Sequence, residues 1–372
     1  MKIQKMTRNL LLFAFVLASL QTLNAQDSLK TWMLGPFFRS EDPKPISQSD
    51  PESSFKDPIT GDVAYWKSMA TFNPAAIVKN GKVQVFYRAE EKLGEKEIGG
   101  HRSRIGLMTS EDGVNFQKNK QPVFYPDNDS QKANEWPGGT EDPRLVQTEE
   151  GLFVLTYTQW NRKVPKLAVA TSKDLINWDK HGPVFQNYKD GSYHEQETKS
   201  GAIVTKLENG RLVATKINGK YWMYYGVPTI NLAYSEDLIN WIPLEDFEGK
   251  AAAVLKPRTG YFDSWLVEAG PPPVLTKDGI VVLYNAGNSR NIGQQDLANR
   301  IYTGGQALFS ATEPWKLLDR SAKPFIQPET DFEKSGQYQD GTTFIEGLVY
   351  FQQKWFLYYG TADSMIGVVS TK

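Results

Sequence analysis

A short motif recurs along this chain at similar distances, and it limits the folds that the chain can adopt. Each close copy has an apolar run, a Ser, an Asp two residues later, and an Asn followed by an aromatic residue. Consecutive copies start roughly 60 to 75 residues apart, which is typical of a repeat protein with several strands in each unit. The copies occupy 107–116, 169–178 and 232–241, with a diverged copy at 308–315 and a shortened one at 367–371.

Each copy is expected to close a turn and to pack an aromatic side chain between units. The Ser hydroxyl can hydrogen-bond with the Asp two residues later, and Phe116, Trp178 and Trp241 follow at the same distance. A strand-like run rich in aromatic and β-branched residues precedes each copy. Five units of this kind predict an all-β fold, a five-bladed β-propeller. The expected blades are 68–120, 138–185, 198–245, 262–320 and 338–372.

Residues 1–25 have the order of a secretory signal peptide. A basic start is followed by an apolar stretch from Leu10 to Leu20, which is too short to span a bilayer, and by small residues up to Ala25. We therefore expect 1–25 to be removed and 26–372 to form one exported propeller domain, periplasmic or secreted, with no membrane insertion. Residues Thr31–Arg39 are expected to add a strand to the last blade and close the ring.

Composition excludes several classes of partner and site. The net charge of −1 gives no reason to expect nucleic acid or an acidic partner. The absence of cysteine excludes disulfides, thiolate metal sites and a lipidated cysteine. No spacing of histidines and acids suits a metal ion, and no glycine-rich segment matches a phosphate-binding loop. We therefore predict no metal and no cofactor.

The segment from Gly138 to Arg144 is the strongest candidate for a site. In a propeller the inner strands converge on the axis, so polar residues at blade starts are candidates. Here Glu141 and Asp142 precede Pro143, which restricts the backbone of Asp142. The alternative is a surface turn with a local ion pair of little energetic value.

Other blade starts also carry polar residues. Glu268 stands between Val267 and Ala269, where a buried carboxylate is costly unless it is paired, so we expect it to be functional. Simpler interpretations are ion pairs of Glu90 with an arginine and of Glu197 with Lys199. Paired carboxyl groups suit glycoside chemistry. The further candidates are Asn73, Glu90, Arg88 and Arg104 in blade 1, Glu197, Lys199 and Tyr225 in blade 3, and Asp363 in blade 5.

Together these motifs resemble glycoside hydrolase family 130, the mannoside phosphorylases and mannosidases, over most of residues 68–372. That family is a five-bladed propeller, in agreement with the repeat count. The segments that carry the resemblance are Phe72-Asn73-Pro74-Ala75, Tyr87-Arg88-Ala89-Glu90, Glu141-Asp142-Pro143-Arg144, Ala269-Gly270-Pro271-Pro272 and Tyr358-Tyr359-Gly360-Thr361-Ala362-Asp363.

The resemblance implies roles for individual residues. Asp142 matches the general acid of the family, in which the proton is thought to pass through a hydroxyl of the bound mannose. The positions that match those holding the non-reducing mannose are Asn73, Arg88, Arg144 and Asp363. We expect Glu90, Arg104, Glu141, Lys199 and Tyr225 to add to substrate binding.

The chain departs from the phosphorylases where phosphate would bind. They carry Lys-Ile-Gly where this chain has Leu266-Val267-Glu268, and an Arg-Asn pair where it has roughly Glu197 to Ser200. Two family histidines are also replaced, near Tyr225 and at Asn285. Phosphate needs such cations. One extra unit charge about 4 Å away is worth roughly 4 kcal/mol at an effective dielectric constant near 20, enough to exclude phosphate.

These departures, with the export signal, predict an exported, inverting, exo-acting β-mannosidase. The resemblance to the hydrolase branch of the family suggests β-1,2-linked manno-oligosaccharides or glycans as substrates, although no residue of the chain fixes the linkage. Asp142 would be the acid, Glu268 the base for water, and Glu197 a helper that holds the water. Inversion implies carboxyl groups about 6.5–9.5 Å apart or a relayed proton.

Three alternatives stay open. A phosphorylase would use inorganic phosphate, with Lys199 and Arg162 rebuilding an anion site. A non-catalytic propeller would bind carbohydrate without turnover. A furanosidase would use acidic residues at blade starts, as other five-bladed families do.

Overall fold

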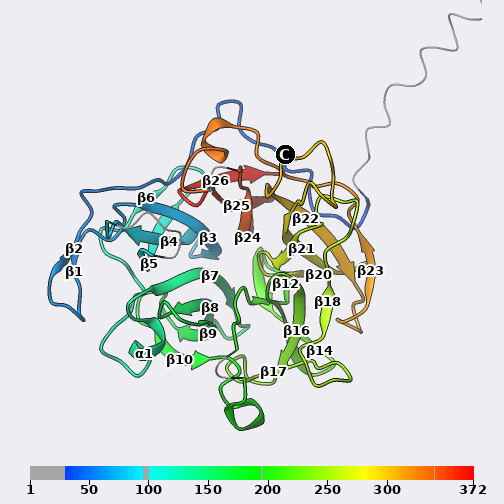
Figure 1. The fold of residues 1–372 in the computed structure, drawn as a ribbon, viewed down its shortest axis with the longest axis horizontal. Coiled ribbons are helices and arrows are strands. Elements are labelled where there is room, and N and C mark those ends of the chain that lie inside the picture. Colours follow the sequence, from blue (N-terminus) through cyan, green and yellow to red (C-terminus); the bar gives the residue numbers. More distant parts are fainter. Residues whose placement is uncertain (1–29, 95–99, 194–195, 339) are drawn as a thin grey trace, which may run out of the picture.

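The computed structural model describes residues 30–94, 100–193, 196–338 and 340–372. Within them, antiparallel β-sheet blades surround a central axis (Figure 1). This confirms the predicted five-bladed β-propeller. The predicted signal peptide, residues 1–25, lies outside the described residues.

The strands of the five blades fall inside the predicted ranges, except that β18 (Ala253–Leu255) pairs with β16 (Ile230–Ser235) and extends blade 3 beyond its predicted end at residue 245. Blade 1 comprises β3 (Ala70–Lys79), β4 (Lys82–Glu91), β5 (Arg102–Ser110) and β6 (Gln117–Lys118). Blade 2 comprises β7 (Gly139–Gln147), β8 (Phe153–Trp160), β9 (Pro165–Ser172) and β10 (Asp179–Pro183). Blade 3 comprises β11 (Ala202–Ile203), β14 (Lys216–Ile217), β15 (Lys220–Tyr225), β16 (Ile230–Ser235), β17 (Trp241–Pro243) and β18 (Ala253–Leu255). Blade 4 comprises β19 (Leu266–Ala269), β20 (Val274–Thr276), β21 (Gly279–Gly287), β22 (Tyr302–Phe309) and β23 (Leu317–Arg320). Blade 5 comprises β24 (Phe344–Phe351), β25 (Lys354–Thr361) and β26 (Met365–Ser370).

A hairpin between β11 and β14 ties three blades together. Its strand β12 (Thr205–Glu208) pairs in parallel with β20 of blade 4, and β13 (Arg211–Ala214) pairs in parallel with β7 of blade 2. The other elements are the outlying pair β1 (Phe55–Lys56) and β2 (Val63–Ala64), the helix α1 (Lys132–Glu135), and the 3-10 turns η1 (Tyr188–Gly191) and η2 (Asp331–Glu333).

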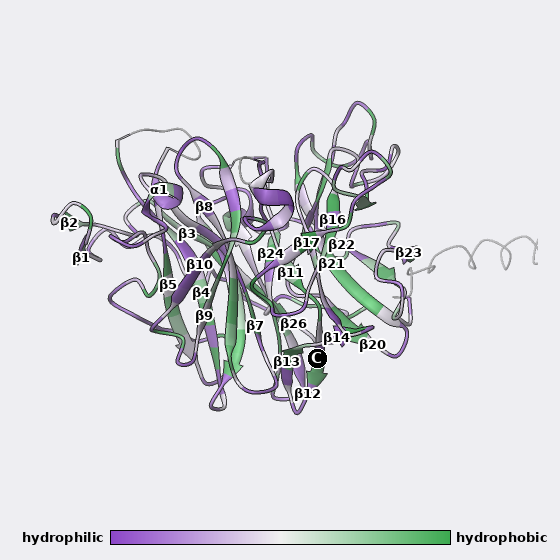
Figure 2. Cartoon of the chain, turned by 90° about the horizontal axis from the view of Figure 1, so that it is seen from below, coloured by the Kyte–Doolittle hydropathy of each residue, from purple (hydrophilic) through white to green (hydrophobic). Residues whose placement is uncertain are grey.

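The hydrophobic core lies between neighbouring blades. One cluster joins Phe86 of blade 1 to Leu155 of blade 2, and another joins Tyr87 of blade 1 to Tyr358 of blade 5. In Figure 2 the hydrophobic colour concentrates in the strands, while most connecting loops are hydrophilic. Burial of apolar area between sheets is what holds the blades in a ring, since it contributes about 25 cal/mol per Å².

The repeated motif forms the predicted turn. In blade 1, Ser110 Oγ lies 2.9 Å from Asp112 Oδ1, which also accepts the backbone N–H groups of Val114 and Asn115. The turns at Ser172 and Ser235 repeat this pattern. The motif therefore recurs because one turn chemistry connects outer strands in successive blades.

The aromatic residue of each copy packs toward the neighbouring blade, as predicted. Phe116 contacts Tyr358 edge to face with ring centroids 5.9 Å apart, and Trp178 contacts Phe86 at 6.0 Å. Trp241 is buried in the cluster between blades 2 and 3.

The N-terminal segment lies beside the last blade. Phe38 donates to the carbonyl of Ser370 at 2.8 Å and accepts from its N–H at 3.0 Å. Thr31–Arg39 therefore reaches β26 as predicted, but through an isolated bridge at Phe38 rather than a strand. Trp32 packs into the cluster between blades 4 and 5.

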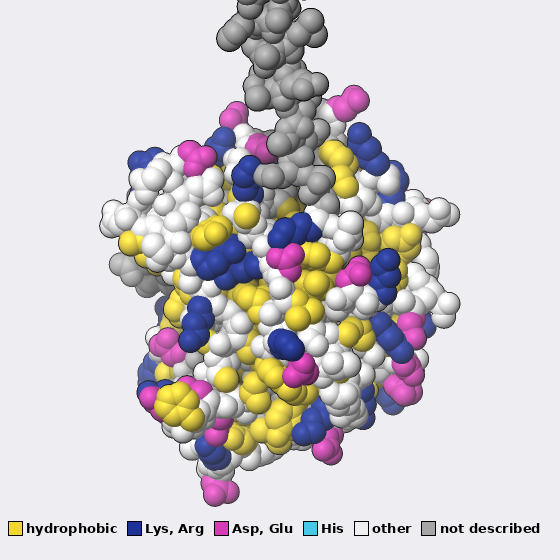
Figure 3. Space-filling model, turned by 90° about the vertical axis from the view of Figure 1, so that its right-hand side faces the viewer, with side chains coloured by type: hydrophobic (Ala, Val, Ile, Leu, Met, Phe, Trp, Pro, Cys, Tyr) yellow, Lys and Arg dark blue, Asp and Glu magenta, His cyan; other side chains and the backbone are white. Residues whose placement is uncertain are grey.

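One side of the molecule shows hydrophobic side chains interspersed with acidic and basic ones (Figure 3). Among the described residues, no helix has the length and apolar character needed to cross a bilayer.

Candidate active site

Two cavities meet at Asp142, where the first strands of the blades converge. The first, of about 300 Å³, is here called the Asp363 cavity, and the second, of about 360 Å³, the Glu197 cavity. Both are lined by Arg88, Asp142 and Lys199. Polar residues at the blade starts thus come together.

Register shifts in two strands orient the side chains of two of these residues. The register of β3 shifts between Phe72 and Pro74, and that of β7 shifts between Glu141 and Arg144. The intervening Asn73 and Asp142 each have φ of 47°, the left-handed region, which Asn and Asp tolerate better than other non-glycine residues. Such bulges redirect a side chain at the end of a strand, and here both side chains meet.

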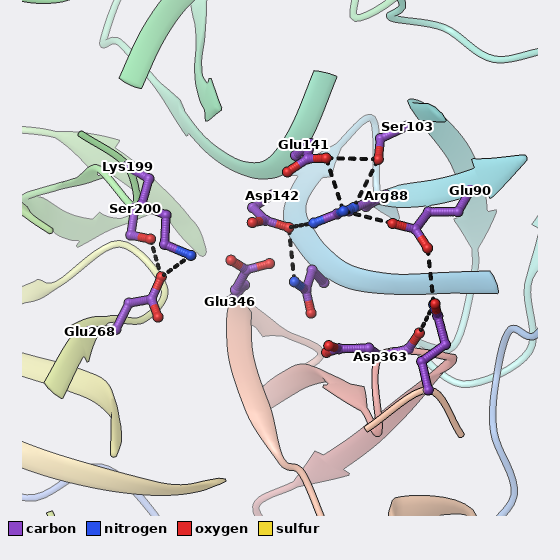
Figure 4. Close-up of polar contacts among 12 residues, drawn as sticks. Arg88, Glu90, Ser103, Glu141, Asp142, Lys199, Ser200, Glu268, Glu346 and Asp363 are labelled. Carbon is purple, nitrogen blue, oxygen red and sulfur yellow. Dashed lines mark hydrogen bonds and ion pairs between the residues drawn. The ribbon is translucent and has the colours of Figure 1, made fainter. Parts of the chain in front are cut away.

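Asp142 is held by two donors. Its Oδ1 accepts from Asn73 Nδ2 at 2.8 Å and from Arg88 Nη1 at 3.2 Å. The guanidinium of Arg88 also contacts Glu90 Oε1 at 2.6 Å and Glu141 Oε1 at 2.9 Å (Figure 4). Arg88 is buried and lies over the ring of Phe72, so its charge is fixed in place.

The two neighbouring acids of β7 differ in proton affinity. Burial raises the pKa of Glu141 to about 7, although Arg88 opposes the shift. Burial also acts on Asp142, but there the cations Arg88 and Lys199 and the amide of Asn73 outweigh it and lower the pKa. Near neutral pH the proton of this pair therefore rests on Glu141.

Glu268 forms a group of its own with two residues that precede β11. Lys199 Nζ lies 3.3 Å from its Oε1, and the Ser200 hydroxyl donates to the same oxygen (Figure 4). The side chain of Glu268 is 3% exposed, against 33% for Lys199. The attraction of Glu268, opposed by burial, raises the pKa of Lys199. The ion pair considered from the sequence, Glu197 with Lys199, is replaced by this one.

The remaining candidates divide between the cavities. Asn73, Glu268 and Asp363 line the Asp363 cavity, and burial raises the pKa of Asp363 to about 6. Glu197 and Tyr225 line the Glu197 cavity together with Glu141. Glu197 and Glu268, predicted to act together on one water, thus line different cavities.

Three predicted substrate-binding residues line neither cavity. Arg144 is buried and donates to the carbonyl oxygens of Gly270 at 2.8 Å and Ala269 at 2.7 Å. Arg104 is buried in ion pairs with Asp57 at 2.5 Å and Glu91 at 3.0 Å. Glu90 forms an ion pair with Arg88. Arg162, considered for an anion site, donates to the backbone carbonyl of Gly100 and lines neither cavity.

Sequence reasoning missed several residues around the site. Arg300 lines the Asp363 cavity with the aromatic residues Trp265, Tyr302 and Tyr338. Arg300 and Tyr338 come from the insertion in blade 4 and from the entry to blade 5, where the repeat gives no guide, whereas Trp265 directly precedes β19 and Tyr302 begins β22. Glu346 is fully buried beside Arg144, at 2.9 Å. The sequence contains a pattern that could have identified Glu346, because it is, like Glu268, a lone acid in an apolar run.

Among the described residues, no group of three or more His, Asp and Glu side chains is arranged to hold a metal ion.

Comparison with known proteins identifies the family. A family model described as β-1,4-mannooligosaccharide phosphorylase, of glycoside hydrolase family 130, matches residues 48–372. The 1,2-β-oligomannan phosphorylase of Thermoanaerobacter sp. (strain X514) is 32% identical over 307 residues, 82% of this chain and 90% of that protein. The β-1,2-mannobiose phosphorylase of the same strain is 29% identical over 313 residues, again 82% and 90%.

Solved structures agree with the fold and the family. One, described by the statement that the GH130 family of mannoside phosphorylases contains glycoside hydrolases that target β-1,2 mannosidic linkages in Candida mannan, is 49% identical with a TM-score of 0.90. It covers 92% of this chain and 95% of its own. A glycosyl hydrolase from Bacteroides ovatus is also 49% identical, with a TM-score of 0.90 and the same coverage.

The curated relatives contradict the prediction of a hydrolase. All four that match are named phosphorylases, of β-1,2- or β-1,4-linked mannosides, and they favour the phosphorylase alternative. The prediction rested on the loss of phosphate-binding cations and on Glu268 as an added negative charge that repels phosphate. The structure instead pairs that carboxylate with Lys199, so the argument that it excludes phosphate fails.

The match over residues 48–372 and the curated relative at 32% identity establish that this protein is an enzyme acting on mannosides and belongs to glycoside hydrolase family 130.

Proposed function

We propose that this enzyme cleaves β-1,2-linked manno-oligosaccharides by phosphorolysis, with release of mannose 1-phosphate. The observation that carries the proposal is the position of Asp142 on the wall common to both cavities, with the Lys199–Glu268 pair in one of them. A sugar in each cavity would bring the bond between them to Asp142.

The charges around the Asp363 cavity support phosphate as the acceptor. Lys199 and Arg300 both line it, and Glu268 is the carboxylate that Lys199 already neutralises. Charge-assisted hydrogen bonds from such cations are the usual means of holding an oxyanion. In the proposed step a phosphate oxygen bonds to the anomeric carbon as the glycosidic C–O bond breaks, and the leaving oxygen takes a proton.

The proton chemistry of β7 suits a relay: Asp142 is ionised at rest because its pKa is lowered, so it delivers a proton to the leaving oxygen only after taking one from a neighbouring group. Glu141, whose pKa burial raises to about 7, is its immediate neighbour and holds a proton near neutral pH. A bound sugar hydroxyl beside Asp142 offers a relay, as the family resemblance implies. Correctly placed acid catalysis contributes about 10²–10⁴-fold to a rate.

The test is to incubate β-1,2-mannobiose with the purified protein, with and without inorganic phosphate. We expect mannose 1-phosphate and mannose to form only when phosphate is present. Release of two mannose molecules at the same rate without phosphate would overturn phosphorolysis. No turnover of any β-mannoside in either condition would overturn the enzymatic assignment of the site and leave sugar binding alone.

We also propose that the protein is exported after cleavage behind Ala25, as its basic and apolar N-terminus suggests. N-terminal sequencing of the protein from its native cells tests this. A mature N-terminus at Met1, together with recovery in the cytoplasm, would contradict it.

A further inference from the structure

Glu346 is a buried acid that the proposed reaction does not use. It is the extra residue where the register of β24 shifts between Ile345 and Gly347, as Asp142 is in β7. Asn285 fixes this backbone by donating to the Ile345 carbonyl at 3.1 Å and accepting from its N–H at 2.7 Å. In Figure 4 the Glu346 carboxyl lies between Asp142 and Glu268, although it lines neither cavity.

The contacts of Glu346 do not suit a carboxylate. Neither of its oxygens accepts a hydrogen bond from any described residue. Arg144 Nη2 lies 2.9 Å from Oε1, but its guanidinium donates to the backbone carbonyls of Asp142, Ala269 and Gly270. A buried carboxylate without hydrogen bonds is strongly disfavoured relative to the neutral acid.

The charges around Glu346 also favour its protonated form. The acids of this cluster outnumber the cations Arg88, Arg144 and Lys199, which favours the protonated form of some of the acids. Glu346 is faced by Arg144 and Asp142 of β7, by Glu268 of β19, and by Lys199. Burial, with the two neighbouring carboxylates, raises its pKa well above the ordinary value despite both cations. The acids are Glu90, Glu141, Asp142, Glu268, Glu346 and Asp363, and the cations are Arg88, Arg144 and Lys199.

We propose that Glu346 keeps its proton at neutral pH and acts as a positioning residue, packing under Arg144 without adding a third negative charge beside Asp142 and Glu268. Arg144 joins the strand of Asp142 to the end of β19, the strand of Glu268. The neutral Glu346 thereby holds the two sides of the site at a fixed separation. This role in the reaction rests on the proposed function, whereas the protonation state does not.

Glu333 provides a matched control, because it is equally buried and also faces an arginine. Its carboxylate accepts from Tyr359 at 2.6 Å, from Arg39 at 2.9 Å, and from two backbone N–H groups. Burial raises its pKa, but these hydrogen bonds outweigh burial and lower it. Glu333 is thus ionised where Glu346 is neutral.

The experiment measures thermal midpoints of wild type, Glu346→Gln and Glu333→Gln between about pH 5 and pH 8. An acid with a raised folded pKa binds more protons folded than unfolded, so its contribution to stability falls as pH rises above about 4.5. Glu346→Gln removes this loss, and its midpoint should rise relative to wild type by several degrees toward pH 8. Glu333→Gln should instead lower the midpoint by an amount that stays constant over this range, because the stabilisation from a lowered folded pKa is fully present above about pH 4.5 and is lost only below it.

A midpoint difference for Glu346→Gln that is constant with pH, or that becomes more unfavourable toward pH 8, would overturn the proposal. Should that variant not fold, Glu346→Met removes the same charge at similar volume and carries the same expectation. In the infrared spectrum at neutral pH, the carboxylic acid C=O band of wild type should lose intensity in either variant. An unchanged band would overturn the proposal.

The positioning role is tested by turnover of β-1,2-mannobiose. Glu346→Ala should lower kcat by about tenfold or more with little change in KM, and Glu346→Gln should recover most of the loss. Equal kcat in the Ala variant and wild type would overturn this role. Failure of the proposed function is distinguishable, because wild type would then show no phosphate-dependent turnover while the stability measurements remain valid.

Discussion

Lys199 Nζ lies 3.3 Å from Glu268 Oε1, and this contact decides the charge of the cavity beside Asp142. Glu268 comes from β19 in blade 4, whereas Lys199 comes from the segment before β11 in blade 3. The ion pair thus joins two blades at the axis. Because the carboxylate is partnered, Glu268 does not face an incoming anion as an isolated negative charge, and the cations Arg88 and Arg300 line the same cavity beside Asp142 and Asp363.

The first prediction concerns the Lys199→Met variant. Loss of the Lys199 ammonium group leaves the 3% exposed side chain of Glu268 without its cation and removes a proposed ligand for phosphate. We expect the KM for phosphate to rise at least about tenfold, equivalent to about 1.4 kcal/mol, in steady-state assays at fixed β-1,2-mannobiose.

Lys206→Met is the matched control for this change. Lys206 is 34% exposed, close to the 33% of Lys199, and pairs with Glu208 on the hairpin away from both cavities. It should leave the phosphate dependence as in wild type. An equal KM for phosphate in both variants would contradict a phosphate-binding role of Lys199.

The second prediction concerns the Asp142→Asn variant, which keeps the size of the side chain but removes the acid. We expect kcat on β-1,2-mannobiose to fall by about 10³-fold, within the range for acid catalysis, with little change in KM. An aryl β-mannoside with a very acidic leaving group needs no proton for its departure. The kcat of the variant on that substrate should therefore fall far less. Equal losses on both substrates would refute the acid role, and Asp278→Asn in the exposed β20–β21 turn is the control.

The residues that could be predicted from the sequence act through local chemistry or through repetition. The turn at Ser110 and Asp112 spans a few residues, so each copy of the motif is enough to predict it. Blade order then follows from spacing, and it brings Asn73 and Asp142 together because both stand at blade starts.

What could not be predicted depends on how distant blades face one another. Lys199 is two residues from Glu197, yet it pairs with Glu268, because the closed ring places blade 4 nearer to its ammonium group. Arg144 sits in a motif that matches mannose-binding positions, but its length and planarity let it reach backbone carbonyls below the cavity. Glu346 could have been found, since the argument applied to Glu268 holds for it too.

The third prediction concerns pH and Glu141. Its pKa of about 7 means that the proton beside Asp142 is lost as pH rises through 7. We expect kcat/KM of wild type to fall on the alkaline side with a midpoint near this value. In Glu141→Gln the side chain has no proton to supply, so kcat/KM should fall and the alkaline limb near pH 7 should be lost from the pH–rate profile.

Stability gives an independent check on Glu141. Because its folded pKa lies above the unfolded value, its contribution to stability is fully present below about pH 4.5 and is lost as pH rises toward 7. Glu141→Gln should flatten the fall of the thermal midpoint in this window. A steeper fall in the variant would mean that Glu141 is ionised in the folded protein.

The last prediction concerns the Asp237→Ala variant, in the turn of the third motif copy. Asp237 accepts from Ser235 Oγ, from the N–H groups of Ile239 and Asn240, and from the Asn240 amide, all within 3.0 Å. Its removal leaves the backbone groups of the turn to water and should destabilise the protein by about 1–2 kcal/mol, measured by urea denaturation near neutral pH.

Thr312→Ala in the fourth copy is the control, because Thr312 occupies the Asp position there and its hydroxyl lies 3.5 Å from Ser310 Oγ, a long and weak hydrogen bond. Thr312→Ala should destabilise the protein less than Asp237→Ala does.

The difference in destabilisation between the two variants should also depend on pH. Burial raises the pKa of Asp237, but hydrogen bonds from Asn240, Ile239 and Ser235 outweigh it and lower the pKa. The stabilisation is therefore present above about pH 4 and is lost as pH falls below it, so the two variants should converge in acid. Equal destabilisation by both at neutral pH would show that the Asp of the motif contributes nothing to the turn.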